Sequence, residues 1–194
     1  MIDHLRLLKN LTNRFYSLPD KDWELFSSIW KPFEAKRKVI ITAEGEVEKF
    51  LYFVADGVQR VYYSDDLQRE ATLVFTYAPS FGGVLDSFLL QQPSKYFYET
   101  LTPSVFLRTS FIEVQKVAEE SRAIQQLIQN GTNLSFSGLM ERTTELQCFS
   151  SEEKFKNLLK RSPHILNLVP HKYLANYIGI DATNFSKLIN SVKI

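Results

Sequence analysis

The sequence has very little of the chemistry that binds metals or forms covalent cross-links. It contains one cysteine, Cys148, and three histidines, His4, His164 and His171. One cysteine excludes an internal disulfide, and it excludes any iron–sulfur or zinc site that needs four thiolates from one chain. The histidines are scattered along the sequence, so we expect no metal site.

Long apolar runs are also lacking. No segment approaches the roughly 20 apolar residues of a membrane-spanning helix, and the first residues lack the basic and then apolar pattern of a signal peptide. We therefore expect no membrane partner and a cytoplasmic location. The sequence has no P-loop, no nucleophile elbow and no acid–base cluster visible in the spacing, so we expect no enzyme and no catalytic residues.

Apolar and aromatic residues, in contrast, are abundant, at 44% and 13% of the 194 residues, which is enough for one domain or two small ones. The net charge of +1 is unevenly distributed. From residue 150 onward 7 Lys and Arg stand against 3 Asp and Glu, whereas the preceding residues hold 16 against 19. A basic C-terminal part suits nucleic-acid binding, although a solvated face could have the same composition.

The region from Phe33 to Ser110 contains short runs rich in Val, Tyr, Phe and Thr. Gly, Asp, Pro and Ser separate them, which is typical of an antiparallel sandwich or barrel. The predicted strands are Val39–Thr42, Leu51–Val54, Val58–Tyr63, Ala71–Tyr77, Tyr96–Leu101 and Val105–Thr109. Helices are expected before them, from His4 to Phe15 and from Asp22 to Trp30, with Pro19 and Pro32 as boundaries.

From Phe111 to Phe149 the pattern is helical. A stripe at alternating spacings of three and four comprises Ile128, Thr132, Ser135, Leu139, Arg142, Leu146 and Phe149. It favours a long helix that pairs with its twin in a parallel dimer, although a helix packed within the monomer would give nearly the same pattern. Gly131 and Gly138 each cost about 1 kcal/mol relative to alanine in a helix interior. Close backbone approach would compensate for this cost, and a break near Asn130 is the alternative.

The segment from Val169 to Asn190 predicts a helix-turn-helix. Gly179 ends the first helix, because such turns need a left-handed residue, and Asp181 caps the second. The second helix carries Phe185, Leu188 and Ile189 inward. Its outward side offers Ala182, Thr183, Asn184, Ser186, Lys187 and Asn190. These groups can meet base edges and phosphates in a major groove, whereas an ordinary helical hairpin is the alternative. A further helix, Glu152 to Arg161, is expected behind the capping signal at Ser150.

A barrel, a long helix and a C-terminal helix-turn-helix in this order resemble the Crp/Fnr family of bacterial transcription regulators, over essentially the whole chain. The most specific residues are Gly45-Glu46, Phe53-Val54-Ala55-Asp56-Gly57-Val58-Gln59-Arg60, Glu70, Pro79, Phe81 and Gly82. The second run matches the family's Phe-Val-x-x-Gly-x-x-Arg pattern, and the last three residues match the entry to its phosphate-binding cassette. The resemblance implies an α+β fold. Its parts are an N-terminal antiparallel jelly-roll barrel of the cyclic-nucleotide-binding type with flanking helices, a long dimerisation helix and a C-terminal helical domain.

The resemblance also implies the domains and the function. The sensor barrel would span residues 1–110, the dimerisation helix 111–148 and the DNA-binding domain 149–194, without the wing that follows in many members. The implied protein is a homodimeric regulator that binds double-stranded DNA. The alternative is a small-molecule-binding module that acts through protein contacts, and salt-dependent DNA association discriminates the two.

The cassette departs from the family's pattern at both charged positions. Gly83 stands where the ribose-binding Glu is expected, and Ser94 stands where the phosphate-binding Arg is expected. Lys95 is adjacent, but successive strand residues face opposite sides. We therefore expect that cyclic AMP does not bind in the usual manner, and we assign no definite cofactor. A cyclic nucleotide, another small effector, or none stays open. The candidate effector pocket comprises Gly82, Gly83, Val84, Ser94 and Lys95, with Phe75, Tyr77, Tyr96 and Tyr98 as possible lining.

The DNA-reading helix also departs from the family. Ala182, Thr183 and Lys187 occupy the positions that usually carry Arg, Glu and Arg. The candidate DNA contacts are His171, Lys172, Ala182, Thr183, Asn184 and Lys187. The low positive charge predicts a shallow salt dependence, because each neutralised phosphate contributes about −0.9 to the log–log slope of affinity against salt.

Overall fold

The structure is a computed structural model that describes residues 2–67 and 69–191. It consists of two compact units. Unit 1 comprises Met1–Val61 and Phe75–Leu134, and unit 2 comprises Tyr62–Val74 and Ser135–Ile194. Residues 192–194, where the predicted absence of a wing would be judged, lie outside the described residues. Among the described helices, none combines the length and the apolarity needed to cross a bilayer.

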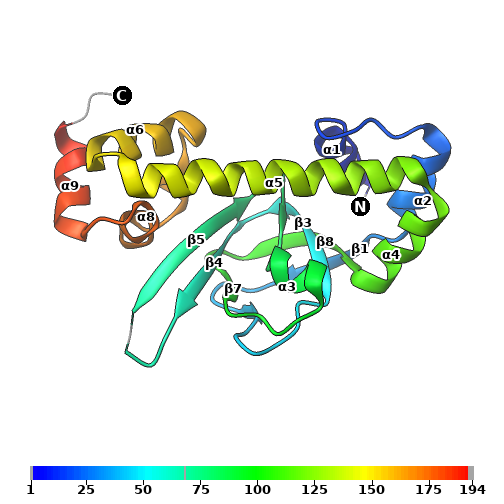
Figure 1. Ribbon diagram of the computed structural model, residues 1–194, viewed down its shortest axis with the longest axis horizontal. Helices are drawn as coiled ribbons and strands as arrows, with labels where there is room; N and C mark the ends of the chain where they lie inside the picture. The colour runs from blue at the N-terminus through cyan, green and yellow to red at the C-terminus, as the bar shows by residue number, and fades with distance from the viewer. Residues whose placement is uncertain (1, 68, 192–194) are drawn as a thin grey trace. The chain divides into compact units, whose positions relative to one another are not determined.

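The strands of the described residues form two four-stranded sheets (Figure 1). The first has the order β1-β8-β3-β6, with β1 Lys31–Ala35, β8 Ser104–Ser110, β3 Phe50–Asp56 and β6 Ser80–Gly82. The second has the order β2-β7-β4-β5, with β2 Ile40–Thr42, β7 Phe97–Thr100, β4 Val58–Ser64 and β5 Glu70–Tyr77. Tyr52 of β3 and Tyr98 of β7 join the sheets, with ring centroids 5.7 Å apart. The predicted antiparallel α+β fold is thus confirmed, with its strands arranged as two sheets.

Two of these strands were not predicted. β1 contains Pro32, which the sequence suggests is a boundary, yet a proline fits here because β1 is the edge strand of its sheet. β6 has three residues, Ser80-Phe81-Gly82, of which only Phe81 is of a type enriched in strands. The six predicted strands are all present, with ends that differ by one or two residues.

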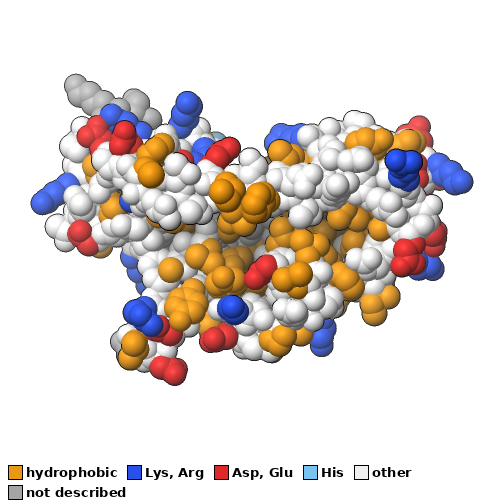
Figure 2. All heavy atoms as spheres, viewed as in Figure 1, with side chains coloured by type: hydrophobic (Ala, Val, Ile, Leu, Met, Phe, Trp, Pro, Cys, Tyr) orange, Lys and Arg blue, Asp and Glu red, His pale blue; other side chains and the backbone are white. Residues whose placement is uncertain are grey.

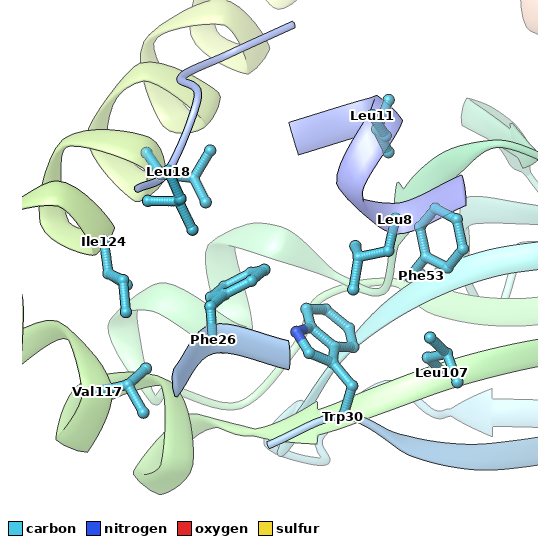
Figure 3. Packing of buried hydrophobic residues seen from close by; sticks show 10 residues of the cluster. Leu8, Leu11, Leu18, Phe26, Trp30, Phe53, Leu107, Val117 and Ile124 are labelled. Atoms are coloured by element: carbon cyan, nitrogen blue, oxygen red, sulfur yellow. The ribbon is translucent and has the colours of Figure 1, made fainter. Parts of the chain in front are cut away.

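Helices cover the outer side of β3 and β8 in unit 1. They are α1 Ile2–Thr12, α2 Asp20–Ser28, α4 Phe111–Glu120 and the first part of α5 Arg122–Cys148. Their buried side chains meet Phe53 and Leu107 of the sheet in one cluster (Figure 3). The cluster comprises Leu8, Leu11, Leu18, Phe26, Trp30, Phe53, Leu107, Val117, Ile124 and Leu127. Burial of this apolar surface fixes the sheet that carries the candidate effector pocket.

The single helix predicted from 111 to 148 is in fact two helices, because α4 ends at Glu120 and α5 begins at Arg122, on either side of Ser121. Its backbone is extended, with φ −140° and ψ 119°, and its Oγ accepts a hydrogen bond from the amide of Ile124 at 3.2 Å. Ser121 therefore serves as a cap for the next helix. α5 then runs without interruption through Gly131 and Gly138, so the alternative break near Asn130 is wrong.

Unit 2 packs short helices together. They are α6 Ser151–Arg161, α7 Ile165–Leu168, α8 His171–Ile178 and α9 Ala182–Ser191, and in Figure 1 three of them, α6, α8 and α9, gather at the C-terminal end of α5. Their buried apolar residues are Phe155, Leu158, Leu159, Ile165, Val169, Leu174, Ala175, Ile178 and Phe185. These residues give unit 2 a core of its own.

Replacing Ser150 with alanine is expected to lower the free energy of unfolding by about 1 kcal/mol. The Ser150 Oγ accepts from the amide of Glu153 at 3.3 Å, and the Glu153 carboxylate accepts from the Ser150 amide at 2.8 Å. This is the capping box that the sequence predicts. Urea denaturation measures the change, and Ser150→Thr, which keeps the hydroxyl, is the control. Equal losses in both variants would contradict a capping role.

Candidate functional site

The turn between α8 and α9 has the geometry that the sequence predicts. Gly179 ends α8 in the left-handed conformation, with φ 69° and ψ 39°, and its amide donates to the carbonyls of Ala175 and Asn176. Asp181 precedes α9, and its Oδ1 accepts a hydrogen bond from the amide of Asn184 at 2.8 Å. A left-handed stop and a side-chain cap two residues apart set the two helices at a tight angle.

α9 has one buried side and one open side. Phe185 is 1% exposed, and its ring meets that of Phe155 edge to face with centroids 5.4 Å apart. Leu188 and Ile189 are half-buried beside it. The side chains predicted to point outward are all exposed: Ala182, Thr183, Asn184, Ser186, Lys187 and Asn190. The open side of α9 therefore carries mostly short polar side chains and one cation, Lys187.

The two candidate contacts at the start of α8 are exposed but have partners. The His171 ring lies 5.7 Å from that of Phe185, and the Lys172 Nζ lies 4.6 Å above the Tyr173 ring. His171 thus also covers the core of unit 2. The Lys172 ammonium remains at the surface, where it can meet a phosphate.

The candidate effector residues of unit 1 differ in what they contact. Gly82, Gly83 and Val84 connect β6 to the short helix α3 Leu85–Leu90, and Gly82 is buried against the hydroxyl of Tyr98. Gly83 has φ +109°, a conformation that other residues rarely adopt.

Ser94 forms hydrogen bonds to the main chain of two loops. It is buried, its Oγ donates to the carbonyl of Tyr96, and its main chain bonds to Gly45 and Glu46. Lys95 beside it is exposed. Ser94 therefore stabilises a turn.

Aromatic and polar side chains fill the space between the sheets beside this site. Tyr98 is fully buried, and its hydroxyl is hydrogen-bonded to that of Thr76 at 3.1 Å. The fully buried amide of Gln59 lies 2.8 Å from the hydroxyls of Thr76 and Ser104. Of the other predicted lining residues, Phe75, Tyr77 and Tyr96 are half-buried. Burial raises the pKa of Tyr98 far above its ordinary value of 10.0, so the phenol stays neutral.

Glu48 is the acidic group of this region. It is 2% exposed and lies beside Gly83, where its carboxylate accepts hydrogen bonds from the Thr42 hydroxyl at 2.6 Å, the Phe50 amide at 3.1 Å and the Val84 amide at 3.3 Å. Burial raises its pKa above the ordinary 4.5, and the hydrogen bonds partly offset that rise. Glu48 could not be identified from the sequence, because a single Glu in a loop carries no pattern.

Solved structures of known regulators share this arrangement of elements. The structure of FixK2 from Bradyrhizobium japonicum has a TM-score of 0.74 at 14% identity, and the match covers 84% of this chain and 83% of that one. The catabolite activator protein of Thermus thermophilus has a TM-score of 0.58 at 20% identity, covering 91% and 84%. A protein from Eubacterium rectale assigned to the Crp/Fnr family of transcriptional regulators has a TM-score of 0.66 at 16% identity, covering 89% and 82%. The chain has the fold of the Crp/Fnr regulators. No protein-family model and no curated protein matches the sequence.

Arg60 is the last residue of the Phe53–Arg60 run that resembles the Crp/Fnr family. In the structure it forms an ion pair with Glu99. Its Nε lies 2.9 Å from the Glu99 carboxylate, and the two side chains are only 4% and 13% exposed. The pair links the neighbouring strands β4 and β7. Arg60 therefore neutralises a charge within the sheet, where an unpaired guanidinium would be costly.

Within unit 2, Glu145 connects α5 to α6. Its carboxylate accepts from Arg142 at 3.2 Å, from Asn157 at 3.2 Å and from Arg161 in a two-pronged contact, one bond of which measures 2.8 Å. Arg142 also donates to the carbonyl of Tyr177 and lies 3.9 Å above its ring. One buried carboxylate thus holds two helices together, and Arg142 adds α8.

Asn176 holds α8 against the first residues of β5 in unit 2. Its Nδ2 donates to the carbonyl of Glu70 at 2.6 Å, and its Oδ1 accepts from the amide of Thr72. β5 is the edge strand of its sheet, so these main-chain groups face away from β4. This contact could not be predicted from the sequence, because Asn176 lies more than 100 residues from Glu70 and from Thr72 along the chain.

Proposed function

We propose that the chain is a sequence-specific DNA-binding transcription regulator of the Crp/Fnr type. The observation that carries this proposal is the open side of α9, where Thr183, Asn184 and Lys187 stand exposed on a helix whose opposite side is buried through Phe185. Short polar groups on such a helix suit the base edges of a major groove, and Lys187 suits a base or a phosphate. His171, Lys172 and Ala182 complete the proposed contact surface.

We further propose that the regulator is a homodimer that pairs through α5. Figure 2 shows hydrophobic side chains exposed along the middle of this helix. Leu134, Phe136, Leu139 and Met140 are 53%, 64%, 54% and 55% exposed, which is unusual for aliphatic and aromatic residues that lie so close together. A Cβ added at Gly131 or Gly138 would meet no atom within 4 Å, so nothing in the described chain requires glycine there. A second α5 at close approach would explain both features.

The proposal assigns residues 1–110 to the sensor, 111–148 to dimerisation and 149–194 to DNA binding. Two recognition helices would meet successive major grooves, one DNA turn apart. A signal would change the angle between α5 and the DNA-binding domain. Because bacterial regulators of this type act on chromosomal DNA, we place the protein in the cytoplasm.

Lys187→Ala is expected to weaken binding to a cognate operator about tenfold and to reduce the salt slope by about 1, since each is the expected loss for one cationic contact. Thr183→Ala is expected to relax the base preference with a smaller loss of affinity. Fluorescence anisotropy on operators selected from a palindromic library, measured from low to moderate salt, gives both quantities.

Lys116→Ala is the matched control, because it removes the same charge from an exposed position on α4. The proposal predicts that this variant binds like the wild type. Failure of the wild type to bind any member of the library at any salt concentration would reject DNA binding and favour a module that acts through protein contacts.

A further inference from the structure

The Glu48 carboxylate lies where buried hydrogen-bond donors converge from three parts of unit 1. The Thr42 hydroxyl comes from β2, the Phe50 amide from β3, and the Val84 amide from the turn before α3. Both carboxylate oxygens accept, and the described partners are hydroxyl and amide groups rather than cations. Converging neutral donors of this kind form a binding site for an anion.

The main chain of Glu48 is anchored as firmly as its side chain. Its amide donates to the Ser87 Oγ at 2.9 Å, and that hydroxyl donates to the carbonyl of Gln92 at 2.6 Å. The Gln91 side chain donates to the Glu48 carbonyl at 3.4 Å. The backbone that carries the carboxylate is therefore tied to α3 and to the loop that follows.

Gly83 makes room for this carboxylate. A Cβ at position 83 would lie 3.4 Å from the Glu48 Oε2 and 3.3 Å from the carbonyl oxygen of Phe50, at a φ of +109°. A side chain there would be strained and would crowd the buried acid. Gly83 and Glu48 thus form a matched pair.

We propose that Glu48 is a built-in anion, whose carboxylate occupies the donors at Thr42, Phe50 and Val84 and closes this site to phosphate-bearing ligands. The buried titratable neighbours of the carboxylate are Tyr52 and Tyr98, and burial raises the pKa of both phenols, so both stay neutral. Arg108 hydrogen-bonds to the Tyr52 side chain, whereas the hydrogen bonds described for the Glu48 carboxylate come from a hydroxyl and two amides. Burial raises the pKa of Glu48, as expected for an acid held by neutral donors alone. The consequence of this site rests on the proposed function: the regulator would bind DNA without a cyclic nucleotide.

Chemical rescue tests the proposal on the full chain. Glu48→Ala leaves three buried donors without an acceptor, so its melting temperature should fall below that of the wild type. Sodium formate should then raise the melting temperature of Glu48→Ala by about 2 to 4 °C above that in sodium chloride at equal ionic strength. The wild type should show no such difference between the two salts, and neither should Glu48→Gln, which keeps an acceptor oxygen in place. Equal effects of formate on all three proteins, or none on Glu48→Ala, would overturn the proposal.

A measurement on the wild type keeps the test independent of how well the variant folds. The amide NMR signals of Phe50 and Val84 should not shift when millimolar inorganic phosphate or cyclic AMP is added. A saturable shift of both signals would overturn the proposal. None of these readouts involves DNA, so a failure of the built-in anion and a failure of DNA binding are distinguished by separate experiments.

Discussion

Replacing Phe185 with alanine is expected to lower the stability of unit 2 by about 3 to 5 kcal/mol and to abolish DNA binding. The side chain is 1% exposed, and its ring packs against Phe155 of α6 and His171 of α8. Its removal leaves a cavity where α6, α8 and α9 meet. Urea denaturation followed by far-UV circular dichroism measures the loss as an earlier transition of the helical unit.

Lys187→Ala is the control for this experiment, because it lies on the open side of the same helix. Surface substitutions of this kind usually change stability by no more than about 0.5 kcal/mol. The two variants should therefore distinguish a loss of folding from a loss of DNA contact. Phe185→Ala should lose DNA binding because unit 2 unfolds, whereas Lys187→Ala should bind DNA more weakly while it stays folded. A Phe185→Ala protein with wild-type stability would show that α9 does not depend on this packing.

Replacing Glu145 with alanine is expected to cost about 2 to 4 kcal/mol, because it leaves Arg142 and Arg161 without their shared acceptor. The side chains of Glu145 and Arg142 are 7% and 11% exposed, whereas that of Arg161 is 41% exposed, which places the cost below that of a fully buried triad. Glu145→Gln, which keeps one acceptor oxygen, should lose less. Calorimetric unfolding of both variants measures the difference, and equal stability of wild type and Glu145→Ala would contradict the connecting role.

The same carboxylate makes unit 2 sensitive to acid. The Arg161 guanidinium lowers the pKa of Glu145 below its ordinary 4.5, and Arg142 adds to the effect. A depressed pKa gives stabilisation that is complete above pH 4.5 and is lost as the pH falls through the lower, folded value. The melting temperature of the wild type should therefore fall in that range more steeply than that of Glu145→Gln. Parallel curves would contradict the assignment.

The helix-turn-helix could be predicted from the sequence because its signals are local. Gly179, Asp181 and the apolar spacing around Phe185 act within one or two turns of chain, and the structure places each as expected. The capping box at Ser150 is local in the same sense. The six strands predicted between residues 39 and 109 are also local signals, because each is a short run rich in Val, Tyr, Phe and Thr between turn residues.

The remaining features depend on partners that are distant in sequence. Pro32 is compatible with a strand only because β1 lies at a sheet edge, and Ser121 interrupts a pattern that reads as one helix. Glu48 and Asn176 draw their roles from groups brought close by folding. The candidate effector residues show the same limit, since Gly83 faces a buried acid while Ser94 stabilises a turn.

The side-chain amide of Asn176 also shields the edge strand β5 from pairing with a second copy of the protein. An uncovered strand margin is a template on which another polypeptide can lengthen the sheet, and natural proteins shield such margins. Here a single side chain satisfies the outward carbonyl of Glu70 and the outward amide of Thr72. Any movement that detaches α8 from β5 would expose both groups together, so reorientation of α8 and α9 would carry a risk of aggregation.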